Sequence, residues 1–181
     1  MNIYKRLCEA KTENKITSVF TDEEDRSLFT PGYIDAIDQS WVRIKILENY
    51  GSFDGYGVRP LSSVVDVVTD SDFEESLKKL TERKPKPVFP EFSIIDNGDS
   101  ILISSITYAH KSKLPITFWD MENKDEYIGH IDNIFDDKFR FRRLKAYGIE
   151  AGISTFKVGD IFMLDVGGNM ERSYLFLNQS K

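Results

Sequence analysis

Residues 32–55 read GYIDAIDQSWVRIKILENYGSFDG, and residues 129–152 read GHIDNIFDDKFRFRRLKAYGIEAG. Both stretches open with Gly-x-Ile-Asp and close with Tyr-Gly-x-x-x-Gly. Extending the comparison aligns residues 32–80 with residues 129–177 without a gap, with agreement at glycine, aspartate and apolar positions. A gapless match of this length predicts that one structural unit occurs twice in the chain.

Alternation inside the repeat predicts strands with one buried face. Apolar and charged residues alternate in WVRIKIL (residues 41–47) and in KFRFRRL (residues 138–144). The core is expected to contain the apolar members, Val42, Ile44, Ile46, Phe139 and Phe141. The outer face is expected to carry the charged members, Arg43, Lys45, Lys138, Arg140 and Arg142. Further short strands are expected around Val19 and over residues 28–37 and 58–68.

Helical periodicity surrounds these strands. Ile3, Leu7 and Ala10 lie at helical spacing near the start of copy one. In copy two, residues 99–111 also fit a helix, although their content of isoleucine, threonine and tyrosine fits a strand as well. Copy one ends in DSDFEESLKKL, residues 70–80, an amphipathic segment with capping residues at its start.

Together these patterns predict a mainly β protein with short helices, of the α+β class. We expect two duplicated five-stranded small barrels, closed or half-open, each preceded by a short helix. The first covers residues 1–80 and the second residues 93–181. Residues 81–92 contain three prolines and several charges, and are expected to form a semi-extended linker.

A helix followed by five strands, with Gly32-x-Ile34-x-x-x-Asp38 and an apolar strand after it, resembles the first motif of Sm-like (LSm) proteins. It is similar to uncharacterised bacterial proteins with tandem Sm-like or SH3-like small barrels. The resemblance implies assembly by pairing of edge strands, and single-stranded RNA held in the loop after this motif. The family's pocket pattern is Asp-x-x-Met-Asn, whereas this chain has Asp38 and Trp41 followed by Val42, and copy two lacks the aspartate. The RNA pocket is therefore not carried over.

Composition bounds the environment and the partners. The chain has 181 residues and a formal net charge of −6, which disfavours strong binding to a phosphate backbone over its whole surface. Its one cysteine, Cys8, excludes an internal disulfide and fits a reducing compartment. No apolar run approaches the ~18 residues that a membrane span needs. A cytoplasmic protein without membrane association is expected.

No catalytic, cofactor-binding or metal-binding motif is recognised in the chain. The histidines His110 and His130 are expected to be structural, because Tyr33 takes the place of His130 in copy one. Asp35 and Asp132 recur at equivalent positions, and they fit either turn residues at strand ends or a pair of catalytic carboxylates. We therefore expect a protein that is not an enzyme, needs no cofactor and has no evident small-molecule substrate.

The candidate binding surface combines residues from both copies. They are Asp38, Trp41, Lys45 and Tyr50 in copy one, and Lys138, Arg140, Arg142, Arg143, Lys145 and Tyr147 in copy two. The cations of copy two either bind an anionic partner or are neutralised by nearby aspartates. The two tyrosines adjoin glycines that turn the chain, and they either pack over the barrel or belong to the surface.

Two functions of different classes fit these observations. The first is a non-enzymatic binding or assembly module that contacts another protein, or a second copy of itself, through strand edges. The alternative is binding of single-stranded RNA through the basic face of the second copy. The duplication and the lack of a catalytic cluster favour the first function, and the family resemblance favours the second.

Overall fold

Two units with one plan make up the chain. The computed structural model shows a mainly β protein of the α+β class. It describes residues 2–84, 92, 100–122 and 125–180. The chain divides into the units Met1–Phe89 and Pro90–Lys181. The border falls inside the predicted linker 81–92, of which residues 85–91 lie outside the described residues.

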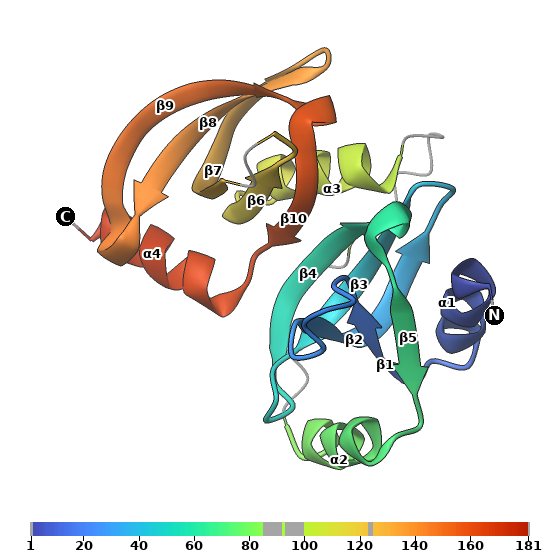
Figure 1. The fold of residues 1–181 in the computed structure, drawn as a ribbon. Helices are drawn as coiled ribbons and strands as arrows, with labels where there is room; N and C mark the ends of the chain where they lie inside the picture. Colours follow the sequence, from blue (N-terminus) through green and yellow to red (C-terminus); the bar gives the residue numbers. More distant parts are fainter. Residues whose placement is uncertain (1, 85–91, 93–99, 123–124, 181) are drawn as a thin grey trace. The chain divides into compact units, whose positions relative to one another are not determined.

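The first unit holds an antiparallel sheet, with one helix before it and one after it along the chain (Figure 1). Its elements are α1 (Ile3–Thr12), β1 (Ile16–Phe20), β2 (Phe29–Ile37), β3 (Trp41–Leu47), β4 (Phe53–Pro60), the 3-10 turn η1 (Leu61–Ser63), β5 (Asp66–Thr69) and α2 (Asp72–Thr81). The strands lie in the order β5-β1-β2-β3-β4.

The second unit repeats this succession. Its elements are α3 (Ile101–Lys111), β6 (Ile116–Asp120), β7 (Glu126–Phe135), β8 (Lys138–Lys145), the 3-10 turn η2 (Ala146–Gly148), β9 (Ile149–Lys157), the 3-10 turn η3 (Val158–Asp160), β10 (Ile161–Val166) and α4 (Asn169–Gln179). The strand order β10-β6-β7-β8-β9 matches that of the first unit position by position. The duplication predicted from the sequence is therefore confirmed in the fold.

The expectation of small barrels is corrected, because the five strands of each unit are arranged as an open sheet. A barrel closes when the first and last strands of its sheet pair with each other. Among the described residues, β4 does not pair with β5, and β9 does not pair with β10. β5 is short, with four residues that all pair with β1, and its other edge pairs with no strand in the described part of the chain. The strands still bend strongly, as the long arc of β9 shows (Figure 1).

Helix caps decide the one ambiguous segment. Residues 101–111 form the helix α3, and Ser100 caps it by accepting a hydrogen bond of 3.3 Å from a backbone N–H of the first turn. The helix predicted over residues 70–80 is α2. It is capped by Ser71, and Glu74 completes a capping box. Sequence reasoning did not predict α4, which follows Gly168 and has no side-chain cap.

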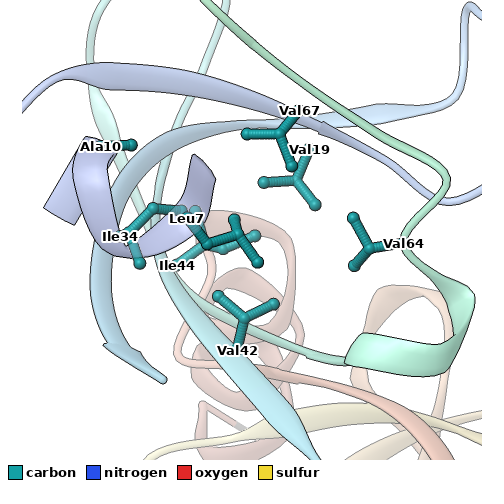
Figure 2. Packing of buried hydrophobic residues seen from close by; sticks show 8 residues of the cluster. All are labelled: Leu7, Ala10, Val19, Ile34, Val42, Ile44, Val64 and Val67. Atoms are coloured by element: carbon teal, nitrogen blue, oxygen red, sulfur yellow. The ribbon is translucent and has the colours of Figure 1, made fainter. Parts of the chain in front are cut away.

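The core of the first unit is aliphatic. Figure 2 shows side chains of α1 pointing toward those of β2 and β3. The cluster consists of Leu7, Ala10, Val19, Ile34, Val42, Ile44, Val64 and Val67. The predicted core residues Val42 and Ile44 are confirmed, whereas Ile46 is only half-buried and the adjacent Leu47 is buried. A register shift between β3 and β4 at Lys45/Leu47 accounts for this break in the alternation, because a bulge reverses the alternation.

The second unit contains a cluster of aromatic rings. Five rings contact one another at centroid distances of 4.8–6.1 Å. They belong to Phe118, Tyr127, Phe139, Phe141 and Phe156. Phe139 and Phe141 are fully buried, as the alternation predicted. Each buried Phe side chain contributes about 1.5–3 kcal/mol through removal of apolar surface from water.

The repeated glycine of Gly-x-Ile-Asp has a steric cause. A Cβ atom at Gly32 would overlap the backbone carbonyl oxygen of Lys45 in the neighbouring strand, and a Cβ atom at Gly129 would overlap that of Arg142. Neither oxygen can move without breaking the sheet. Both copies therefore need glycine at this position.

A buried carboxylate ties the last helix of each unit to its first strand. In the first unit Ser18 of β1 donates a hydrogen bond to Glu74 of α2. In the second, Thr117 of β6 donates to Glu171 of α4 over 2.7 Å. All four residues are buried, and the two glutamates align in the sequence repeat. The hydrogen bond compensates for much of the cost of burying the carboxylate.

Candidate binding surface

The duplicated aspartates lie within strands, at bulges. The register between β2 and β3 shifts at Asp35, and the register between β7 and β8 shifts at Asp132. A bulge leaves its extra residue without a partner across the ladder, so the carboxylate is available to side chains of the next strand. Both aspartates bind an arginine there. Neither is a turn residue at a strand end.

In the first unit, this arginine is buried. Arg43 is 1% exposed, and its Nε donates to Asp35 Oδ2 over 2.6 Å. Lys45 Nζ lies 3.5 Å from the other carboxylate oxygen. The alternation correctly places Arg43 opposite the aliphatic core, but the expectation that this face is open at Arg43 is wrong. Lys45 belongs to the candidate surface and is committed to the same ion pair.

In the second unit, Asp132 binds an arginine at a different position, Arg142. Arg142 donates to Asp132 over 3.1 Å and to Glu150 over 2.9 Å. The hydrogen bonds to Asp132 and then to Glu150 hold the pKa of Arg142 above its usual value. Arg142 was predicted as part of a cationic surface. Two carboxylates neutralise it.

His130 belongs to this cluster without a catalytic geometry. Its Nε2 lies 3.5 Å from Asp132 Oδ1. Burial lowers the pKa of His130, although the charge of Asp132 opposes this, so the ring is neutral at pH 7. The other histidine, His110, places Nδ1 3.2 Å from the Ile131 carbonyl oxygen and so joins α3 to β7.

Arg143 and Lys145 do not continue the alternating outward positions of Arg140 and Arg142 along β8. The register between β8 and β9 shifts after Arg143, which is half-buried and donates to the Ala151 carbonyl over 3.2 Å. Arg143 therefore lies at a bulge and is not part of an open cationic face. Lys145 is exposed at the far end of β8.

Three exposed cations remain on the outer face of β8 and β9. Lys138 lies directly across from Lys157, and Arg140 lies across from Thr155. Within the described part of the chain, no carboxylate forms an ion pair with Lys138, Arg140 or Lys157. Sequence reasoning missed Lys157, which the register of the hairpin brings beside the predicted pair. We call Lys138, Arg140 and Lys157 the cationic row.

The copy-one candidates have local partners. Asp38 Oδ1 accepts hydrogen bonds of 2.7 Å from the backbone N–H groups of Ser40 and Trp41, so it shapes the turn between β2 and β3. Trp41 is half-buried. Tyr50 is exposed and carries the Lys84 ammonium 5.6 Å above its ring. These residues belong to the first unit, whereas the cationic row belongs to the second.

Tyr147 is the more exposed of the two predicted tyrosines, at 75% against 56% for Tyr50. It adopts a left-handed backbone conformation, with φ of 61°, inside η2. The adjoining Gly148 packs against α4, where Asn178 Nδ2 donates to its carbonyl over 3.0 Å. The tyrosine therefore lies at the surface and does not cover the core. β9 starts at Ile149, directly after Gly148.

The outer edge of β9 pairs with no strand in the described part of the chain. At its end, Val158 donates its backbone N–H to the Asp137 carbonyl over 2.8 Å. Hydrogen-bonded and non-hydrogen-bonded pairs alternate along an antiparallel ladder. The register then assigns outward-facing N–H and C=O groups to the residues of the non-hydrogen-bonded pairs, Ile153, Thr155 and Lys157. Their side chains are exposed as well.

Other kinds of site find no support in the described residues. No group of three metal-ligating side chains occurs there. No helix among them is long and apolar enough to cross a membrane. Cys8 is a half-buried free thiol on α1. Comparisons with protein-family models, with curated proteins and with solved structures give no match to this chain.

Proposed function

We propose that this chain is a non-enzymatic binding module, made of two open units of Sm-like type, that holds a protein partner by strand addition at β9. The free edge of β9 is the observation that carries the proposal. A strand added there gains main-chain hydrogen bonds from Ile153, Thr155 and Lys157, while alternate side chains provide selectivity.

Length and composition favour β9 over β5 as the docking edge. β9 has nine residues, whereas β5 has four. Natural edges are often protected by proline or by inward-pointing charges. β9 contains no proline, and its one lysine is its last residue. The outward backbone groups of Ile153 and Thr155 are therefore accessible to a partner strand.

Amide hydrogen exchange followed by NMR tests the edge directly. The amides of Ile153, Thr155 and Lys157 are expected to exchange faster than those of Ser154 and Phe156, which face β8. An uncharged peptide as long as β9, alternating threonine and glutamine, is expected to slow exchange at the outward amides. Protection that is absent at millimolar peptide, or spread evenly over the unit, would contradict strand addition.

Two proline variants give the matched control. Thr155→Pro removes an outward N–H, so it is expected to abolish peptide binding and leave the fold intact. Ser154→Pro removes an N–H that bonds β8 and is expected to destabilise the unit by about 3 kcal/mol. Equal destabilisation by both prolines, measured by urea unfolding, would show that the outward assignment is wrong.

Binding of single-stranded RNA through the basic face is the second candidate. The exposed cationic row favours it, because cations without counter-charges attract phosphates. Buried Phe139 and Phe141 oppose it, because they cannot stack on bases. Filter binding with mixed-sequence RNA at about 0.05 M salt tests it. Retention that Arg140→Glu abolishes would support this candidate, and no retention at that salt would remove it.

A further inference from the structure

The cationic row lies beside the free edge of β9, and this juxtaposition bears on what a bound strand must look like. Lys157 belongs to β9 itself, and Lys138 and Arg140 lie one strand further in. All three side chains are exposed. A strand added at β9 would place every second side chain on the same face, directly beside Lys157, Thr155 and Ile153.

The row lacks its counter-charges in the described part of the chain. Like charges directly across a strand pair are destabilising, and Lys138 and Lys157 are such a pair, with side chains about 5 Å apart at Cβ. The next cation along β8, Arg142, is held by two carboxylates. The outer face thus carries one neutralised arginine, Arg142, and three cations with which an incoming anion can form ion pairs.

We infer that the partner strand at β9 is an extended acidic peptide. One carboxylate of the peptide lies beside Lys157. A second carboxylate lies beside Thr155, from where it reaches Arg140 on β8. An apolar side chain of the peptide covers the exposed Ile153. This inference rests on the proposed strand addition. It adds the charge and the order of the side chains that the edge selects.

Charge argues against a second copy of this chain as the occupant. Pairing of two β9 edges would leave both cationic rows uncompensated, because the edge residues that share their face, Ile153, Thr155 and Lys157, carry no negative charge. An acidic strand does the opposite, because its carboxylate beside Lys157 offsets the repulsion between Lys138 and Lys157, and the next one pairs with Arg140. RNA would supply negative charge too. It would leave the outward backbone groups of β9 without partners.

Four fluorescent probes separate these occupants by anisotropy titration of the full chain at about 0.05 M salt. The first is a peptide as long as β9, alternating glutamate and threonine with one central valine. The second replaces its glutamates by lysine, and the third is the acidic peptide with two adjacent central prolines. The fourth is mixed-sequence single-stranded RNA of similar charge. The acidic peptide is expected to bind at least about tenfold more tightly than the basic peptide.

Variants then assign the charge to the row. Arg140→Glu with Lys157→Glu is expected to weaken the acidic peptide about tenfold or more and to strengthen the basic one. Lys111→Glu with Lys113→Glu changes the net charge equally at two exposed lysines, the last residue of α3 and a residue just after it, and is expected to change the preference less than about twofold. All four substitutions are at exposed positions, so folding is retained and circular dichroism confirms it.

The outcomes distinguish the two levels of the proposal. Equal binding of acidic and basic peptides, both lost in Thr155→Pro, would overturn the acidic preference and keep strand addition. Equal binding of the acidic peptide and its proline form would overturn both, because charge alone would then suffice. RNA bound more tightly than the acidic peptide would overturn the inference in favour of a nucleic-acid surface. Concentration-dependent dimers that Thr155→Pro abolishes would replace the acidic peptide by a second copy.

Discussion

Arg43 and Arg140 occupy equivalent positions in the two units, yet their surroundings differ completely. Arg43 is buried and bound by Asp35. Arg140 is exposed, and Asp132, the counterpart of Asp35, binds Arg142 instead. The same bulge and the same pair of residue types therefore give a structural ion pair in one unit and an uncommitted cation in the other.

Substitution at neighbouring positions explains the exchange. Where the first unit has Lys45, the second has Arg142, whose planar guanidinium spans two carboxylates at once. Glu150, the second carboxylate, stands at the position of Phe53. These two changes explain why Asp132 binds Arg142 and does not bind Arg140. A duplicated unit can acquire a binding surface in this way without altering its fold.

The largest expected effect tests this contrast directly. Arg43→Met keeps the length of the side chain but leaves the Asp35 carboxylate without its main partner, and is expected to destabilise the protein by about 3 kcal/mol. Arg140→Met, its matched control, is expected to stay within about 0.5 kcal/mol of the parent chain. Urea unfolding provides both values. Similar losses in the two variants would mean that the two arginines have the same role.

The second prediction sharpens what the units share. Gly32→Ala and Gly129→Ala each place a methyl group against a backbone carbonyl of the next strand and are expected to cost about 2–3 kcal/mol. Gly159→Ala is the control, because nothing lies within 4 Å of a Cβ atom there. Thermal unfolding measures all three. A tolerated alanine at either strand glycine would contradict the steric reason for the repeated motif.

The third prediction concerns the tie between first strand and last helix. Double-mutant cycles of Ser18→Ala with Glu74→Gln, and of Thr117→Val with Glu171→Gln, are expected to give coupling energies of about 1–2 kcal/mol in both units. Exposed Glu75→Gln provides the background value. Coupling in only one cycle would show that the two helices are held by different means.

The smallest effect is a pH dependence confined to the second unit. The pKa of His130 is lowered, chiefly by burial, so between that pKa and about 6.5 the folded state binds fewer protons than the unfolded state. The free energy of unfolding therefore falls as the pH drops below about 6.5 toward the lowered pKa of His130. His130→Tyr, which restores the residue type of Tyr33, is expected to flatten this slope in urea titrations. An unchanged slope would assign it to other groups.

Periodicity and duplication predicted much of this fold. The alternation in KFRFRRL placed Phe139 and Phe141 in the core, and helical spacing with capping residues located α1 and α2. These features follow from local chemistry, which a single sequence carries. The same reasoning recovered the repeat, since glycines with steric causes keep their spacing.

The remaining features depend on register and on what covers a face. Alternation shows that Arg43 lies opposite the aliphatic core, but it does not show that the arginine is buried. Bulges at Asp35 and Asp132 add one residue to a strand without a sequence signature. Lys157 joined the cationic row only through the register of β8 with β9. Of the three cations in the row, the sequence therefore supplied Lys138 and Arg140, whereas Lys157 required the structure.

The hydroxyl–glutamate contact also has a consequence for how each unit assembles. Ser18 and Glu74 are 56 residues apart, and Thr117 and Glu171 are 54 apart, so each hydrogen bond spans nearly a whole unit. Closing a loop of that length costs chain entropy, which must be offset by contacts formed earlier in the sheet. The last helix is therefore expected to dock late in folding and to be the first element to detach, leaving a carboxylate to rehydrate and a strand hydroxyl exposed.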